Sequence, residues 1–97
     1  MDKKISNQEA FSNKVVWITG ASAGIGEEMA VAFARSGSKL VLSARNSEQL
    51  ERVEKRCYEA GADREGVLVI PLDVVDLDAM PGAVDKVMEA YSRIDLL

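Results

Sequence analysis

The stretch that most constrains the fold of this chain is VVWITGASAGIGEEMA, Val15–Ala30. A run of strand-forming residues stops at a turn with three glycines, and a helix-like pattern follows directly. Glycines at this point can serve either of two purposes. They allow a tight structural turn, or they let a phosphate approach the backbone at the start of a helix.

The rest of the chain alternates between apolar runs of strand length and segments with helical spacing. The predicted strands are Val15–Thr19, Lys39–Ala44 and Val67–Leu72. The predicted apolar helix positions are Ile25, Met29 and Phe33 in the first helix, Leu50, Val53 and Cys57 in the second, and Met80, Val84, Val87 or Met88, and Tyr91 in the third. The order is therefore β-α-β-α-β-α.

Helix-ending and helix-starting residues agree with this order. Gly37 and Gly61 stand where the first two helices should end, and Asn46 or Ser47 stands where the second should begin. Asp76 or Asp78, together with Pro81, suits the start of the third helix.

Apolar strands joined by crossover helices predict an α/β fold with a doubly wound parallel sheet. We expect a partial Rossmann fold of three parallel strands in the spatial order 3-2-1, with IDLL at most beginning a fourth strand. The first strand would then be open on one side. In such sheets ligands bind beyond the carboxyl ends of the strands, which is where TGASAGIG lies.

Composition excludes several classes of function. The net charge of −4 and the absence of a Lys/Arg cluster argue against binding to nucleic acid or an anionic membrane surface, which leaves a small molecule as the expected partner. Cys57 is the single cysteine and there is no histidine, so neither a Cys/His zinc set nor a Ser-His-Asp triad is available.

Residues 1–13 are predicted to form a polar leader and residues 14–97 a single folded unit. No apolar run has the length of a signal peptide core or of a membrane span. A reducing compartment, the cytoplasm, is expected.

The glycine spacing is specific. Gly20-x-x-x-Gly24-x-Gly26 differs from the common G-x-G-x-x-G fingerprint, and no Lys-Ser/Thr pair follows to form a nucleotide-triphosphate loop. Combined with a second strand ending in SAR and a third in LDV, the pattern resembles the short-chain dehydrogenase/reductase family from Lys14 to Leu97. KVVWITGASAGIGEEMA and LVLSARN are most similar to its eukaryotic dehydrogenase/reductase family member 7 group.

The resemblance implies that this chain is the N-terminal half of an NAD(P)-binding domain. The cofactor turn would be formed by Thr19, Gly20, Ser22, Gly24, Ile25 and Gly26. Gly20 would allow the tight turn, while Gly24 and Gly26 would let the pyrophosphate reach the backbone and the helix pack closely. Ile25 would donate its amide at the helix N-terminus and Ser22 its hydroxyl. A glycine-rich turn without a ligand is the alternative.

Cofactor choice depends on the end of the second strand, Ala44-Arg45-Asn46. An acidic residue here would hydrogen-bond the ribose 2′-hydroxyl of NAD, whereas an arginine suits the 2′-phosphate of NADP. Arg45 can hold a phosphate through paired donors, so NADP is predicted over NAD, with Asn46 beside it. The alternative is a solvent-facing arginine at a strand end.

Asp73 and Val74 close the third strand, and the resemblance implies that they contact the adenine edge and ring. Asp73 could instead be a turn or helix-entry aspartate. Tyr58 and Tyr91 are predicted to be packing residues, since neither has a lysine four residues later. Packing roles are also predicted for Trp17 and Cys57, and an ordinary charged helix face for EQLERVEKR.

Members of the family run to more than twice this length, and their catalytic tyrosine, lysine, serine and asparagine would lie beyond Leu97. No residue of this chain inherits those roles. Two hypotheses follow. The chain is the cofactor-binding portion of an NADP-dependent alcohol/carbonyl oxidoreductase, or it acts without chemistry as a nucleotide-binding module or a decoy partner of a full-length relative. Self-association through the open first strand is a further expectation.

Overall fold

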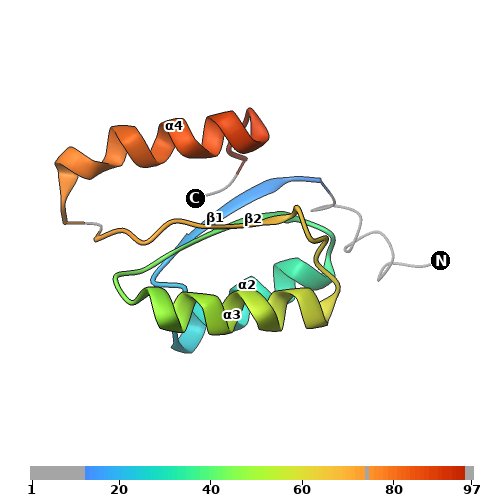
Figure 1. The fold of residues 1–97 in the computed structure, drawn as a ribbon. Coiled ribbons are helices and arrows are strands. Elements are labelled where there is room, and N and C mark those ends of the chain that lie inside the picture. The colour runs from blue at the N-terminus through green and yellow to red at the C-terminus, as the bar shows by residue number, and fades with distance from the viewer. Residues whose placement is uncertain (1–12, 74, 96–97) are drawn as a thin grey trace.

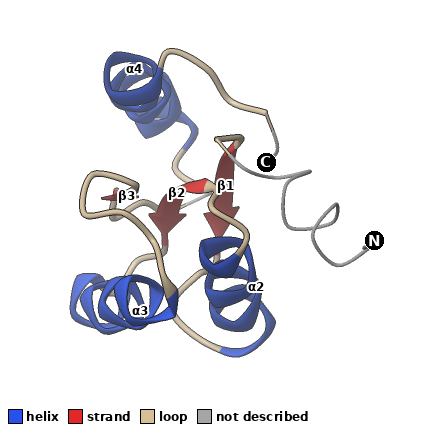
Figure 2. Ribbon diagram, turned by 90° about the vertical axis from the view of Figure 1, so that its right-hand side faces the viewer, coloured by secondary structure: helices blue, strands red, loops and turns tan. Residues whose placement is uncertain are grey.

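The computed structural model describes residues 13–73 and 75–95. Strands and helices alternate along the chain, as predicted. In order they are β1 (Val15–Thr19), α2 (Gly24–Arg35), β2 (Lys39–Ser43), α3 (Ser47–Ala60), β3 (Val67–Val69), a short 3-10 helix η1 (Leu77–Ala79) and α4 (Met80–Tyr91). Helices α2 and α3 cover one face of the sheet, and α4 covers the other (Figures 1 and 2).

The sheet has three parallel strands in the order β1-β2-β3, which confirms the predicted 3-2-1 arrangement read from its other edge. Trp17 lies opposite Val41, and Val41 lies opposite Leu68. The carboxyl ends of the strands therefore meet at one edge of the sheet. The loops that follow the strands are brought together there.

Two strands end earlier than predicted. β2 ends at Ser43 rather than Ala44, and β3 ends at Val69 rather than Leu72. Beyond β3 the pairing continues only through alternate amides, with Ile70 donating to the Leu42 carbonyl and Leu72 to the Ala44 carbonyl, both at 2.9 Å. Pro71 lies between them and has no amide hydrogen to donate. It is therefore tolerated here because β3 is at the edge of the sheet.

Alternate residues of the strands build a separate core on each face of the sheet. Val16 and Ile18 of β1 pack with Leu40 and Leu42 on the side of α2 and α3. Val15, Trp17 and Val41 pack on the side of α4. The buried residues of α3 are Leu50, Val53 and Cys57, as predicted, and those of α4 are Ala83 and Val87.

Trp17 is a packing residue, as predicted, and is 2% exposed. Its indole Nε1 donates a buried hydrogen bond of 3.0 Å to the hydroxyl oxygen of Ser43 on the neighbouring strand. Tyr58 and Tyr91 also pack, each against the edge of a different core. Burial raises the pKa of the Cys57 thiol to about 11, which suits a packing role.

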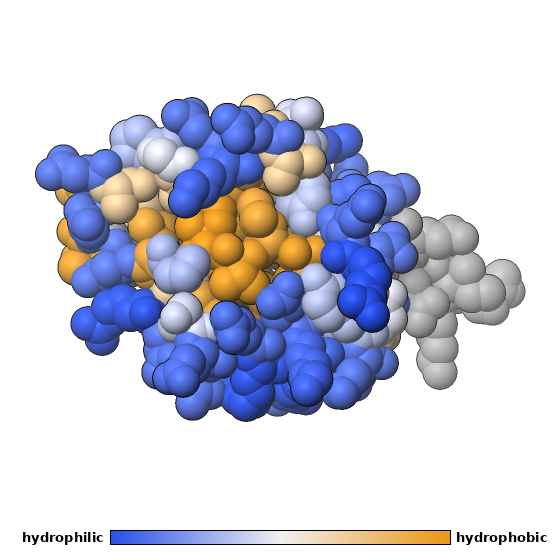
Figure 3. Space-filling view, viewed as in Figure 1, coloured by the Kyte–Doolittle hydropathy of each residue, from blue (hydrophilic) through white to orange (hydrophobic). Residues whose placement is uncertain are grey.

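The edge strand β3 is thinly covered. Leu68 and Val69 are only half-buried, and Figure 3 shows apolar side chains gathered between α4 and α3, over the β3 segment. Within the described residues, no helix combines the length and the apolar character needed to cross a bilayer.

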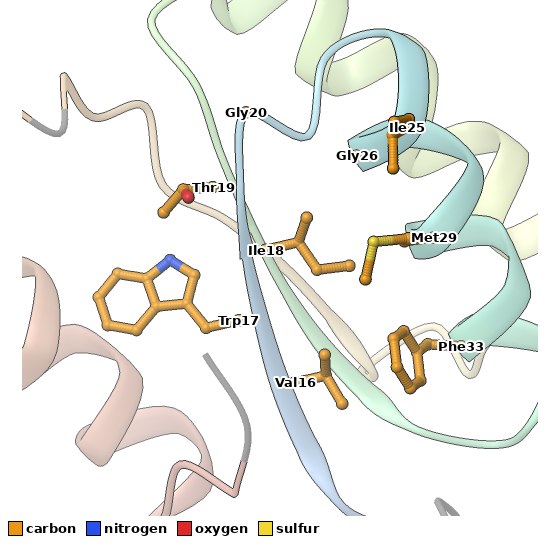
Figure 4. A pocket seen from close by; sticks show the side chains of 9 residues that line it. All are labelled: Val16, Trp17, Ile18, Thr19, Gly20, Ile25, Gly26, Met29 and Phe33. Carbon is orange, nitrogen blue, oxygen red and sulfur yellow. The ribbon is translucent and has the colours of Figure 1, made fainter.

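The predicted apolar face of the first helix is confirmed at Phe33, which is partly buried against the core, and is wrong at Ile25 and Met29. The side chains of Ile25 and Met29 are 80% and 43% exposed, and α2 packs on the sheet through Ala30 and Ala34 instead. Figure 4 shows Met29 and Phe33 facing Ile18 and Val16 of β1. Small residues bring α2 close to the sheet, while Ile25 and Met29 stay exposed.

Most helix ends lie where the sequence predicts them. The Asn46 side-chain oxygen accepts a 3.0 Å hydrogen bond from the Gln49 amide and caps the start of α3. Gly61, with a φ of 122°, is the C-cap that follows the last residue of α3. Asp76 precedes η1, and Pro81 stands in the first turn of α4.

The chain returns to the free edge of β1 after α4. The Asp95 amide donates to the Val15 carbonyl, and the Val15 amide donates to the Asp95 carboxylate, each at 2.9 Å. These two bonds involve Asp95, which lies in the IDLL segment where the predicted fourth strand would begin. Leu96 and Leu97 lie outside the described residues, as do residues 1–12 of the predicted leader.

An ion cluster joins α2 to α3, so the prediction of an ordinary charged face on α3 is wrong. Glu27 is 8% exposed, and its carboxylate receives hydrogen bonds from Arg52 (2.8 and 2.9 Å) and from Arg56. Arg56 also bonds Glu28 at 3.2 Å. The hydrogen bonds from Arg52 and then Arg56 lower the Glu27 pKa to about 2.

This pKa predicts an acid-sensitive contact. As the pH falls from 4.5 towards 2, the unfolded Glu27 carboxyl binds a proton more readily than the folded one, so the free energy of unfolding should decrease. Chemical denaturation across this interval should show a shallower decrease for Glu27→Gln than for the wild-type protein. Glu89→Gln, an exposed position on α4, is the control and should keep the wild-type slope. Equal slopes in all three proteins would contradict the assignment.

Candidate functional site

A cavity of about 340 Å³ opens at the carboxyl edge of the sheet, where the loops after all three strands meet. Its lining residues are Gly20, Ser22, Ala44, Arg45, Asn46, Leu72 and Asp73. Five of these belong to the predicted cofactor site. The topology therefore brings together residues that lie up to 53 positions apart, from Gly20 to Asp73.

Each glycine of the turn between β1 and α2 meets a different steric requirement. Gly20 and Gly24 have φ values of 65° and 60°, which L-residues with side chains rarely adopt. Gly26 has an ordinary helical backbone, but a Cβ atom there would lie 2.2 Å from the Gly20 carbonyl oxygen. The close packing predicted for Gly26 is therefore confirmed. The group that approaches Gly26 is the Gly20 carbonyl of the same turn.

The N-terminus of α2 has open hydrogen-bond donors. The first intrahelical bond inside this turn is from the Glu27 amide to the Ala23 carbonyl, so the amides of Gly24, Ile25 and Gly26 have no partner within the helix. Ala23 is the N-cap and makes no side-chain capping bond. Amides and helix dipole together favour an anion here.

Arg45 lies at the mouth of the cavity and is exposed. Across the described ranges its guanidinium makes no ion pair, so its paired donors are available to a ligand. Neighbouring Asn46 uses its side-chain oxygen to cap α3. Asn46 can therefore offer a ligand its amide nitrogen.

Asp73 also has a structural task. Its carboxylate accepts a 3.1 Å hydrogen bond from the Val75 amide, which is the turn role considered as the alternative. The side chain nevertheless lines the cavity, so the two roles are compatible. Val74, the other predicted adenine contact, lies outside the described residues.

A second, apolar cavity of about 370 Å³ adjoins the first, between β1 and α2. Figure 4 shows Val16 and Ile18 directed toward Met29 and Phe33 across it. Gly20 lines both cavities, whereas Thr19, Ile25 and Gly26 line the second and not the first. Gly24 lines neither of these two cavities and lies with Ile25 in a third one on the outer side of α2.

Sequence reasoning missed Arg52. Its guanidinium bonds the Glu27 carboxylate and also donates, at 3.2 Å, to the carbonyl oxygen of Ser22 in the glycine turn. The sequence pattern could have indicated an ion pair between the two helices. Arg52 and Arg56 are one helical turn apart beside the buried residues of α3, and Glu27 is a charged residue at a core-facing position of α2.

An open parallel sheet with crossover helices and an uncapped helix N-terminus after its first strand defines an α/β protein of the Rossmann type. Within that class the chain belongs to the short-chain dehydrogenase family, whose sequence model, described as short chain dehydrogenase, matches residues 14–97. A curated relative from Mus musculus, dehydrogenase/reductase SDR family member 7, is 46% identical over 88 residues. That alignment covers 90% of this chain and 26% of the relative, so the chain spans about a quarter of its length.

Solved structures agree with this assignment. A metagenomic short-chain oxidoreductase in complex with NADP is 33% identical, with a TM-score of 0.83, and the match covers 91% of this chain and 38% of that one. A short chain dehydrogenase/reductase from Burkholderia phymatum in complex with NAD is 32% identical, with a TM-score of 0.80, covering 89% and 30%. Both dinucleotides therefore occur among structures with this fold.

The close approach at Gly26 predicts different effects for two glycine substitutions. Gly26→Ala should lower the free energy of unfolding by about 1–3 kcal/mol, because the methyl group would overlap the Gly20 carbonyl. Gly82→Ala is the control in α4, where nothing lies within 4 Å of the added carbon. It should raise stability by about 0.5–1 kcal/mol through helix propensity. Urea denaturation measures both, and effects of the same sign would contradict the steric argument.

Proposed function

We propose that this chain is the cofactor-binding portion of an NADP-dependent oxidoreductase, which transfers hydride between NADP(H) and an alcohol or carbonyl substrate in a longer form. The observation that carries the proposal is the placement of the open α2 amides and the Arg45 guanidinium at the loop edge of one sheet. Membership of the short-chain dehydrogenase family supports it.

The residues of the turn would hold the pyrophosphate. The amides of Gly24, Ile25 and Gly26 provide donors, and the absence of side chains at Gly20 and Gly24 leaves the backbone open, since nothing lies within 4 Å of an added Cβ at either position. Ser22 also lines the cavity, and its hydroxyl would be a further donor. When bound, the nicotinamide cofactor supplies or accepts the hydride.

Arg45 would select NADP. Its guanidinium can form two parallel hydrogen bonds to a 2′-phosphate, and its charge complements that group. At the corresponding position an NAD-specific protein would carry a carboxylate for the 2′-hydroxyl, and this chain has Ala44, Arg45 and Asn46 there. Asp73, across the same cavity, would contact the adenine edge, with Val74 against the ring.

Substrate binding and acid/base catalysis would reside in the longer form. The family resemblance assigns catalysis to a Tyr-x-x-x-Lys pair with a serine and an asparagine, and the tyrosines of this chain, Tyr58 and Tyr91, have no lysine at that spacing. We also propose a reducing, cytoplasmic location, in keeping with Cys57 as a buried free thiol.

A second candidate function is a non-catalytic partner that pairs with a full-length relative or with itself. The observation that favours it is the free edge of β1, which borders the apolar cavity lined by Val16, Ile18 and Met29. A strand edge beside apolar surface is a template for association.

The NADP proposal predicts a selective loss of affinity. Arg45→Ala should weaken NADP binding by about 1.5–3 kcal/mol through loss of charged hydrogen bonds, and should leave NAD binding nearly unchanged. Titration calorimetry in the longer form is the measurement. Arg35→Ala, an exposed arginine at the far end of α2, is the control and should affect neither cofactor. Equal losses for both cofactors in Arg45→Ala would remove Arg45 from the 2′-phosphate.

If this chain binds the cofactor and the catalytic groups belong to a longer form, the behaviour of the 97-residue polypeptide by itself can be predicted. It should show no NADP-linked turnover on a panel of alcohols and carbonyls, and it should associate through the β1 edge and have low solubility. Activity assays and light scattering test the two statements. A monodisperse monomer that turns over substrate would overturn both.

A further inference from the structure

We propose that Arg52 is a positioning residue that fixes the orientation of the glycine turn for dinucleotide binding, although Arg52 does not line the cavity. The inference rests on the proposed function, because it concerns how the proposed pyrophosphate site is held in shape.

The contacts of Arg52 connect three elements. Its Nε donates to the Gln49 side chain at 2.8 Å within α3, and its two terminal nitrogens donate to the Glu27 carboxylate of α2 at 2.9 and 2.8 Å. One of these nitrogens also donates to the Ser22 carbonyl at 3.2 Å. These bonds go to Gln49, to Glu27 and to Ser22, so the planar guanidinium is held in one orientation, with one N–H directed at the turn.

The bond to Ser22 determines how one peptide unit of the turn is oriented. In a trans peptide the carbonyl and the following amide point in opposite directions, and none of the described peptide bonds is cis. Because the Ser22 carbonyl points to Arg52, the Ala23 amide points away from α3. Ala23 is the N-cap of α2, so this bond sets the direction of the donor next to the open amides of the helix.

The same cluster adjusts the charge beside the site. Glu27 lies in the first turn of α2, where a lone buried carboxylate would oppose an anion bound at the helix N-terminus. Arg52 and Arg56 both bond Glu27, and Arg56 also bonds Glu28, so the two guanidinium groups balance the two carboxylates and the four side chains carry no net charge. The cluster thus stabilises the helix pair without repelling a phosphate.

Arg56 provides a matched control. Like Arg52 it donates to Glu27, and it lies one turn further along α3, but among the described residues its side-chain bonds go to Glu27 and Glu28 and not to the turn. Arg52→Met and Arg56→Met each remove one ion pair to Glu27 and one positive charge. Only the first removes the bond to the Ser22 carbonyl.

The experiment compares the two variants in the longer form that binds dinucleotide. Arg52→Met should lose affinity for NADP and NAD equally, by about three- to tenfold, because both cofactors share the pyrophosphate. Arg56→Met should stay close to wild type in affinity, although urea denaturation should show a similar loss of stability for both variants. Equal loss of affinity in the two variants, or unchanged affinity in Arg52→Met, would overturn the inference.

A second measurement needs no ligand. Backbone NMR of the free protein should show that the amide shifts and hydrogen exchange of Ala23 and Gly24 change in Arg52→Met and remain as in wild type in Arg56→Met. If wild-type protein binds neither dinucleotide, the proposed function fails, and these amides still decide whether Arg52 positions the turn. Unchanged turn amides in Arg52→Met would overturn the inference.

Discussion

The close approach between Gly26 and the carbonyl of Gly20 is the constraint on which the rest of this structure depends. With a Cβ at residue 26 only 2.2 Å from that oxygen, any residue other than glycine would push α2 away from the end of β1. The compact turn places the start of the helix directly behind the strand. The open amides of α2 therefore remain at the carboxyl edge of the sheet, beside the loops after β2 and β3.

That geometry leaves the positive N-terminal end of α2 without a side-chain cap. The acidic residue in the first turn of the helix is Glu27. Glu27 faces α3 rather than the cavity, and its two arginine partners hold its pKa near 2, so it is ionised at neutral pH. One of those arginines reaches the turn through the Ser22 carbonyl. The contact between the helices and the glycine turn are thus joined in one hydrogen-bonded cluster, in which the buried Glu27 carboxylate is paired with arginines.

The free edge of β1 explains the apolar surface beside the site. Ile25 and Met29 extend past the sheet instead of over it, and with Val16 and Ile18 they line an apolar cavity at that edge (Figure 4). Asp95 returns to the same edge and pairs with Val15 through backbone and side chain. Its pKa is lowered by the hydrogen bond from Arg93 and then by the Val15 amide, so a carboxylate anchors the first residue of β1.

The sequence by itself determined the element order, the parallel sheet, the position of the site and most of its lining, because these follow from local patterns: strand runs, helix caps and glycines at fixed spacing. The predicted face of α2 was right at Phe33 and wrong at Ile25 and Met29, since periodicity identifies an apolar stripe but not which neighbour covers it. The end of β3 could have been predicted from the sequence, because Pro71 has no amide hydrogen to donate to a neighbouring strand. Only the tertiary structure decided the roles of Glu27, Arg52 and Asp95. Each acts through a partner at least 25 positions away, and a contact between distant residues depends on how helices and strands pack rather than on any local pattern.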